Sequence, residues 1–155
     1  MKSVLKIRSI QILLLVLIIA SVSCSSKKNI SKKKVNDSIE FLTNEDYSLT
    51  EVIDLASAQN KQVFVDFYAD WCLPCKILDE EVFNKRDVYN YFNRNFINYK
   101  VDVEKTNGAN LKLIYSANEL PTLLFLDQNG RVITRNNGNV SQTFIMSMAQ
   151  NLVAE

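Results

Sequence analysis

The sequence contains no histidine and only three cysteines among its 155 residues. A structural zinc ion is normally held by four ligands, most often Cys or His. Three cysteines without histidine therefore exclude a complete zinc site built from these residue types within one chain. We predict that the protein uses no metal and no cofactor.

Acidic residues are missing from the first 34 positions, which hold 8 Lys and Arg. The remainder holds 10 Lys and Arg against 17 Asp and Glu, a net charge of −7. Nucleic-acid binding needs clustered Lys and Arg that contact phosphates. This acidic remainder is therefore not expected to bind nucleic acid. The length and the lack of an internal repeat predict one folded domain.

The N-terminus has the pattern of an export signal. Three basic residues lie within the first eight positions, and the apolar run over residues 12–20 is too short to span a bilayer comfortably. The pattern resembles a bacterial lipoprotein signal, in which the cysteine after the small residues is lipidated, although Ser21 stands where that family usually has an aliphatic residue. We expect a lipoprotein-type signal peptide over residues 1–23 and lipidation of Cys24. An ordinary cleaved signal and an uncleaved anchor are the alternatives.

The segment after Cys24 is polar and rich in lysine. Residues 25–40 lack apolar periodicity, which is typical of a flexible tether. We interpret its lysines as a solvated linker rather than as contacts to anionic lipid headgroups. The lipidated N-terminus and tether are assigned to residues 24–44, and the folded domain to residues 45–155.

The folded part alternates between helix and strand signals. Ser48 and Glu51 match a capping box, so a helix is expected from there to about residue 60. Asn129 and Gly130 mark a hairpin turn. The other expected elements are helices over 72–83, 87–93, 109–116 and from Ser141, and strands from 63 and over 96–103, 122–126 and 131–134. This order predicts an α/β fold in which helices flank a small mixed β-sheet.

Residues 63–76, VFVDFYADWCLPCK, organise the rest of the chain. The apolar run predicts a buried strand that leads to a helix start, because Pro74 is tolerated only in the first helical turn. At that start, unpaired N–H groups and the helix dipole lower the pKa of the Cys72 thiol. Cys72 and Cys75 can also close a small disulfide ring, which would constrain the unfolded chain little. We therefore interpret the pair as redox-active rather than structural.

From about residue 45 to residue 153 the chain resembles the thioredoxin family. The resemblance rests on VDFYADWCLPCK, on Leu120-Pro121-Thr122, on the Asn-Gly turn and on Gly138. Within the family it is most similar to the extracytoplasmic branch resembling the C-terminal domain of DsbD-type thiol:disulfide interchange proteins, through YADWCxxCK and LPTLLFL. The resemblance implies a thioredoxin-like fold and a protein thiol-disulfide oxidoreductase.

The resemblance also implies roles for individual residues. Cys72, expected to be exposed, would attack a partner disulfide, and Cys75, expected to be more buried, would resolve the mixed disulfide. Asp66 matches the family's buried aspartate and would take the proton of Cys75, since burial raises the pKa of a carboxyl. Lys100 falls where some members place a partner for this aspartate, but an exposed strand lysine is an equal alternative.

Three further residues are implied to contact the substrate: Trp71, Leu120 and Pro121. Pro121 matches the family's cis-proline, and a cis bond leaves backbone groups of Leu120 free to pair with a bound peptide. Trp71 would contribute partner contact at the rim of the site, or would simply pack beside the helix.

The residues between the cysteines favour a reductant. Strong oxidants resembling DsbA and isomerases resembling protein disulfide isomerase carry His there, whereas this chain has Leu73 and Pro74. We expect a membrane-tethered protein of the cell envelope, periplasmic or otherwise extracytoplasmic, that reduces disulfides in exported proteins with electrons from a membrane thiol donor. The alternative is a non-catalytic docking or copper-handling module; copper would favour nearby His or Met as well as thiolates.

Overall fold

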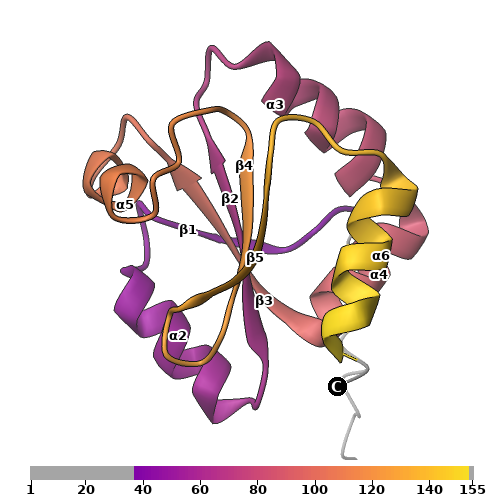
Figure 1. Cartoon of the computed structure of the whole chain (residues 1–155), viewed down its shortest axis with the longest axis horizontal. Helices are drawn as coiled ribbons and strands as arrows, with labels where there is room; N and C mark the ends of the chain where they lie inside the picture. Colours follow the sequence, from indigo (N-terminus) through magenta and orange to yellow (C-terminus); the bar gives the residue numbers. More distant parts are fainter. Residues whose placement is uncertain (1–36, 154–155) are drawn as a thin grey trace, which may run out of the picture. The chain divides into compact units, whose positions relative to one another are not determined.

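The computed structural model of the chain describes residues 37–153 (Figure 1). The signal peptide expected over residues 1–23, the lipidation expected at Cys24 and residues 24–36 of the expected tether lie outside the described residues. Within the described part, no helix has the length and apolar character needed to cross a membrane.

A five-stranded mixed sheet forms the centre of the domain, with the strand order β1-β3-β2-β4-β5. The strands are β1 (Phe41–Thr43), β2 (Gln62–Tyr68), β3 (Phe96–Asp102), β4 (Thr122–Leu126) and β5 (Val132–Asn137). The first three in spatial order run parallel, and β4 and β5 are antiparallel to their neighbours. The expected small mixed sheet is confirmed.

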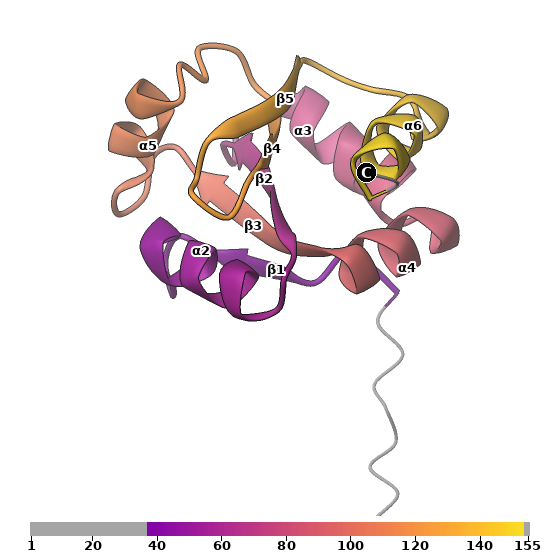
Figure 2. The same cartoon turned by 60° about the horizontal axis from the view of Figure 1, so that its bottom comes forward.

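Helices cover both faces of this sheet (Figures 1 and 2). They are α2 (Leu49–Ala58), α3 (Leu73–Leu78), the π-helix η1 (Asp79–Phe83), α4 (Arg86–Asn95), α5 (Gly108–Ile114) and α6 (Gln142–Val153). Helices α2 and α5 lie on one side of the sheet, and α3, α4 and α6 lie on the other. The helix expected over residues 72–83 is thus an α-helix that continues as a π-helix.

Strand β2 is apolar except for Gln62 at its start and Asp66, and both of its faces are buried. Val65 and Phe67 belong to the core cluster that contains residues of α2 and α5. Phe64 belongs to the cluster formed with α3, η1, α4 and α6, where its ring lies 4.7 Å from that of Phe92. This two-sided burial fixes the direction in which β2 delivers the residues that follow it.

Strand β1 corrects the expected start of the folded domain. Phe41 pairs with Asn98 and Leu42 with Tyr99 in the parallel register of β1 and β3, so the sheet begins inside residues 24–44, which the sequence assigned to the tether. A strand of three residues is too short to produce a recognisable alternation of polar and apolar side chains.

Asn44, directly after β1, holds the loop between β3 and α5. Its side-chain amide donates hydrogen bonds to the carbonyl oxygens of Asp102 (3.1 Å) and Lys105 (2.9 Å), and its Oδ1 accepts one from the N–H of Asp102 (2.9 Å). The Asn44 side chain is buried. These bonds satisfy backbone groups at the end of β3 and in the loop that follows it, so Asn44 positions the loop.

We predict that Asn44→Ala lowers the free energy of unfolding by about 1–3 kcal/mol, because a buried backbone donor and acceptors lose their partner. Urea unfolding of the oxidised protein measures this loss. Asn90→Ala removes the same atoms from an exposed position of α4 and should stay within about 0.5 kcal/mol of wild type. Equal effects of the two substitutions would contradict the role of Asn44.

Candidate redox site

The end of β2 leads into the two cysteines. After Tyr68, the N–H of Cys72 donates to the carbonyl of Ala69 (3.0 Å), and Cys72 becomes the N-cap of α3. Its Sγ accepts a hydrogen bond from the N–H of Cys75 (3.2 Å). Pro74 lies in the first helical turn, as the sequence predicted. A thiolate at Cys72 would receive the same hydrogen bond and the positive end of the helix dipole.

Cys72 and Cys75 form a disulfide with an S–S distance of 2.08 Å. Both residues are only 2% exposed, so the expectation that Cys72 is exposed and Cys75 more buried is wrong for this disulfide form. Cys72 is covered because it packs within the core cluster on the α2 side of the sheet. The apolar residues beside it, Trp71 and Leu73, are 67% and 65% exposed.

Asp66 and Lys100 form an ion pair across the two central strands. They are direct partners in the parallel register of β2 and β3, and Lys100 Nζ lies 3.1 Å from Asp66 Oδ2. Asp66 is 1% exposed, and the Lys100 side chain is 14% exposed. This geometry decides between the two readings of Lys100 in favour of the aspartate partner. The other oxygen of Asp66, Oδ1, has no hydrogen-bond partner among the described residues.

Burial raises the pKa of Asp66 above that of an ordinary aspartate. The positive charge of Lys100 opposes this shift, and the negative charge of Asp79 reinforces it. Desolvation is the largest of these effects, so the neutral carboxyl persists to higher pH than in water. A buried carboxyl with a raised pKa can accept a proton and release it again, so Asp66 can act as a proton acceptor.

Asp79 is a member of this site that the sequence analysis missed. Its Oδ1 lies 2.5 Å from Lys100 Nζ, so one cation serves two carboxylates. Burial would lower the pKa of Lys100, but Asp66 and Asp79 together raise it, and the cation is retained. The Lys100 Nζ also lies over three aromatic rings, at 5.1 Å from the ring centroid of Phe41, 4.8 Å from that of Tyr68 and 5.9 Å from that of Phe83. The sequence feature that could have indicated Asp79 is its spacing, one helical turn after Cys75.

The remaining expected site residues of the described part are Trp71, Leu120 and Pro121. The peptide bond between Leu120 and Pro121 is cis, as the family resemblance implied. Trp71 is too exposed for its second reading, simple packing beside the helix, and its indole N–H donates to Glu104 Oε1 at 2.9 Å. Glu104 was not singled out in the sequence. It lies on the loop that Asn44 holds, so this loop orients Trp71.

A shallow groove of about 390 Å³ opens at Cys72. Its apolar lining consists of Trp71, Leu73, Pro74 and Leu120. The structure thus brings Cys72 together with two of the three expected substrate-contact residues, Trp71 and Leu120; the third, Pro121, is not among the residues that line this groove. Asp66 and Lys100 lie below this surface, in the sheet.

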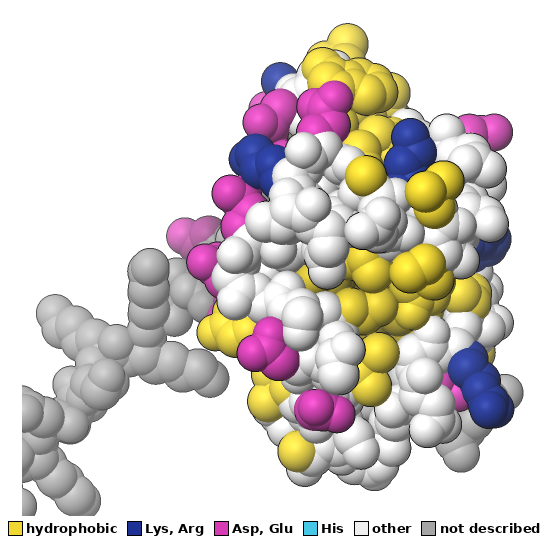
Figure 3. All heavy atoms as spheres, turned by 90° about the vertical axis from the view of Figure 1, so that its left-hand side faces the viewer, with side chains coloured by type: hydrophobic (Ala, Val, Ile, Leu, Met, Phe, Trp, Pro, Cys, Tyr) yellow, Lys and Arg dark blue, Asp and Glu magenta, His cyan; other side chains and the backbone are white. Residues whose placement is uncertain are grey.

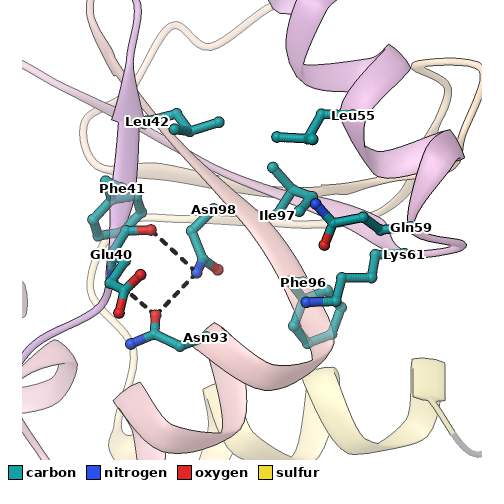
Figure 4. Close-up of a pocket in the computed structure, with 10 residues that line it drawn as sticks. All are labelled: Glu40, Phe41, Leu42, Leu55, Gln59, Lys61, Asn93, Phe96, Ile97 and Asn98. Carbon is teal, nitrogen blue, oxygen red and sulfur yellow. Dashed lines mark hydrogen bonds between the residues drawn. The ribbon is translucent and has the colours of Figure 1, made fainter. Parts of the chain in front are cut away.

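A second hollow, of about 400 Å³, lies at the opposite end of the parallel strands, between β1, β3 and α2 (Figure 4). Leu42, Leu55 and Ile97 face it, and Asn98 donates to Asn93 (3.2 Å) at its polar side. None of its lining residues is a cysteine or an expected site residue. The candidate site is therefore the groove at Cys72.

A sequence model of thioredoxin-like domains matches residues 49–150. The chain belongs to the thioredoxin-like family. The matched range of this thioredoxin-like chain contains both cysteines and all the other expected site residues of the described part. Among the described residues there is no group of three or more His, Cys, Asp and Glu that could hold a metal ion.

Curated relatives of this thioredoxin-like chain include two proteins named thiol:disulfide interchange protein DsbD. The one from Haemophilus ducreyi is 36% identical over 90 residues, 56% of this chain and 16% of the relative. The one from Yersinia pestis is 38% identical over 82 residues, 52% of this chain and 14% of the relative. The chain thus matches only about one sixth of the length of these relatives.

Two solved structures resemble this chain. A candidate disulphide-isomerase from Bacteroides thetaiotaomicron is 35% identical with a TM-score of 0.64, covering 77% of this chain and 97% of that one. The oxidised C-terminal domain of DsbD from Neisseria meningitidis has a TM-score of 0.59 at 24% identity, covers 72% and 99% of the two chains, and supports the fold alone. Fold, family and cysteine pair all support thiol-disulfide exchange as the chemistry of the domain.

The raised pKa of Asp66 makes stability fall with rising pH. A folded state with the higher pKa binds more protons than the unfolded chain, so the contribution is complete below the unfolded pKa and is lost as pH rises through the folded one. We predict that Asp66→Asn removes this contribution. As pH rises above about 4, the ordinary pKa of an aspartate, the free energy of unfolding of oxidised Asp66→Asn should therefore fall less than that of wild type.

Urea unfolding at a series of pH values tests this prediction. Asp54→Asn, on the exposed side of α2, is the matched control and should follow the wild-type profile. Parallel profiles for Asp66→Asn and wild type would show that Asp66 does not titrate differently in the folded state.

Proposed function

We propose that the protein is a membrane-tethered, extracytoplasmic thiol-disulfide oxidoreductase that reduces disulfides in exported proteins. The observation that carries this proposal is the Cys72–Cys75 disulfide at the start of α3, next to a groove that a partner can enter. A disulfide across three residues closes almost no chain, so it stabilises the fold little and fits a pair that opens and closes.

The proposed exchange starts from the reduced pair. The Cys72 thiolate attacks one sulfur of a partner disulfide, forms a mixed disulfide and releases the other partner sulfur as a thiolate. Cys75 gives its proton to Asp66, attacks Cys72 and expels the second partner thiolate, which is then protonated. Two electrons pass to the partner, and the protein ends in its disulfide form. A dithiol of a membrane donor reduces it again.

The cellular setting rests on the sequence and on the relatives. The signal pattern over residues 1–23 and the cysteine at position 24 favour export and lipid attachment. The curated relatives are named thiol:disulfide interchange proteins, and this chain matches a small part of them. A reductant outside the cytoplasm needs a supply of electrons, which favours a membrane thiol donor as its partner.

Single-cysteine variants test the order of attack. Cys75→Ser should accumulate a mixed disulfide with an oxidised substrate protein, because the resolving thiol is absent and Cys72 remains a nucleophile. Cys72→Ser should form little of it, and wild type should complete the exchange. Non-reducing gels with alkylated thiols resolve the species. Equal trapping by both variants would contradict Cys72 as the attacking residue.

The redox potential of the pair tests the direction of electron flow. Equilibration of the full chain against glutathione or dithiothreitol should give a strongly reducing value, near roughly −270 mV. A value near roughly −180 mV would favour disulfide isomerisation, and one near roughly −120 mV would make the protein an oxidant. Either would overturn the proposed reduction while leaving disulfide exchange intact.

Replacing Cys24 tests the tether. If Cys24 carries the lipid, Cys24→Ala should move the exported protein from the membrane fraction to the soluble fraction and prevent incorporation of labelled fatty acid. Cys75→Ala, which leaves position 24 unchanged, should remain with the membrane. Unchanged fractionation of Cys24→Ala without fatty-acid labelling of wild type would favour an uncleaved anchor.

A further inference from the structure

The groove at Cys72 combines an apolar lining with a single charge. Besides its four apolar residues, the groove is lined by Asn118 and Lys112, and Lys112 is the only charged residue among the described residues that line it. On the face drawn in Figure 3, hydrophobic side chains gather at the top, the end at which α3 begins in Figure 1, and both acidic and basic side chains lie close to them.

Lys112 has no countercharge of its own. It lies on α5, and no described residue forms a salt bridge with it. By contrast, Lys100 and Lys105 each contact two or more carboxylates. Glu104, an acidic residue on the loop between β3 and α5, accepts a hydrogen bond from the indole N–H of Trp71. A negative charge that enters the groove therefore meets Lys112 as its available partner.

The disulfide bond between Cys72 and a partner determines which part of the partner enters the groove. Cys72 itself lines it, so a partner sulfur bonded to Cys72 places the neighbouring residues of the partner chain in this groove. Trp71 and Leu73 offer these residues a broad apolar surface, because both are largely exposed. The chain beyond residue 34 is net acidic, with 10 Lys and Arg against 17 Asp and Glu.

We propose that the groove selects disulfides whose reactive cysteine is flanked by an apolar residue and by a carboxylate that pairs with Lys112. The occupant is an extended segment of an oxidised protein, and Lys112 determines specificity rather than reactivity. The inference rests on the proposed function, because the segment is defined by its disulfide with Cys72.

Symmetric disulfide-linked peptide dimers test this inference. In such dimers attack on either sulfur gives the same products. Each peptide holds one Cys, a Leu beside it, and either Glu or Lys at one position within two residues of the Cys. The reduced full chain is mixed with each dimer, the thiols are trapped by alkylation, and the second-order rate constant is measured at low and high salt. Lys112→Glu is compared with Lys61→Glu, which makes the same change of charge.

Lys61 precedes β2 and lines the hollow at the end of the sheet away from Cys72, so it controls for net charge. An exposed ion pair predicts a preference for the Glu dimer of about twofold to fivefold in wild type, weakened by salt. Lys112→Glu should reverse this preference, and Lys61→Glu should keep it.

Equal rates for the Glu and Lys dimers in wild type, at every position, would overturn the specificity while the proposed exchange stands. The same loss of preference in Lys61→Glu would also overturn it, because the effect would then come from net charge. If wild type reduces neither dimer, the proposed function and this inference fail together. Circular dichroism verifies that both variants are folded.

Discussion

Lys100 is the residue on which the rest of the site depends. It joins the buried carboxylate of Asp66 in β2 to Asp79 in η1, and so connects the centre of the sheet to the helix that carries the cysteines. A charge at this depth is tolerated only when it is paired, because removing an ion from water costs roughly several kcal/mol. The two carboxylates and the aromatic rings around Nζ supply that pairing.

This arrangement leaves Asp66 incompletely neutralised. Lys100 is shared with Asp79, and Asp66 Oδ1 has no hydrogen-bond donor among the described residues. A carboxylate with a full set of donors would have a lowered pKa and would hold its negative charge firmly. Because Asp66 lacks a full set of donors among the described residues, it remains able to change its protonation state. If only the stability of the fold mattered, an apolar residue would be favoured at this position of β2.

The sequence predicted the parts of the fold that depend on local chemistry. Capping by Ser48, the turn at Asn129 and Gly130 and the apolar run before Cys72 each leave a signal within a few residues, and the structure confirms the elements that they mark. The parts of the fold that the sequence did not predict depend on contacts between residues far apart in the chain. Strand β1 is defined by pairing with β3, and Asn44 bonds residues 58 to 62 positions away, so neither has a local pattern.

The candidate site also has features that the local sequence indicates and features that depend on packing between distant residues. The spacing of Cys72 and Cys75 indicated the redox pair, whereas the burial of Cys72 follows from packing against residues that the local sequence does not specify. This burial has a chemical consequence. A Cys72 sulfur that is almost inaccessible cannot attack bulky disulfides at random; a partner must present its disulfide along the groove formed by Trp71 and Leu120. Access, as well as the pKa of the thiol, then controls which disulfides react.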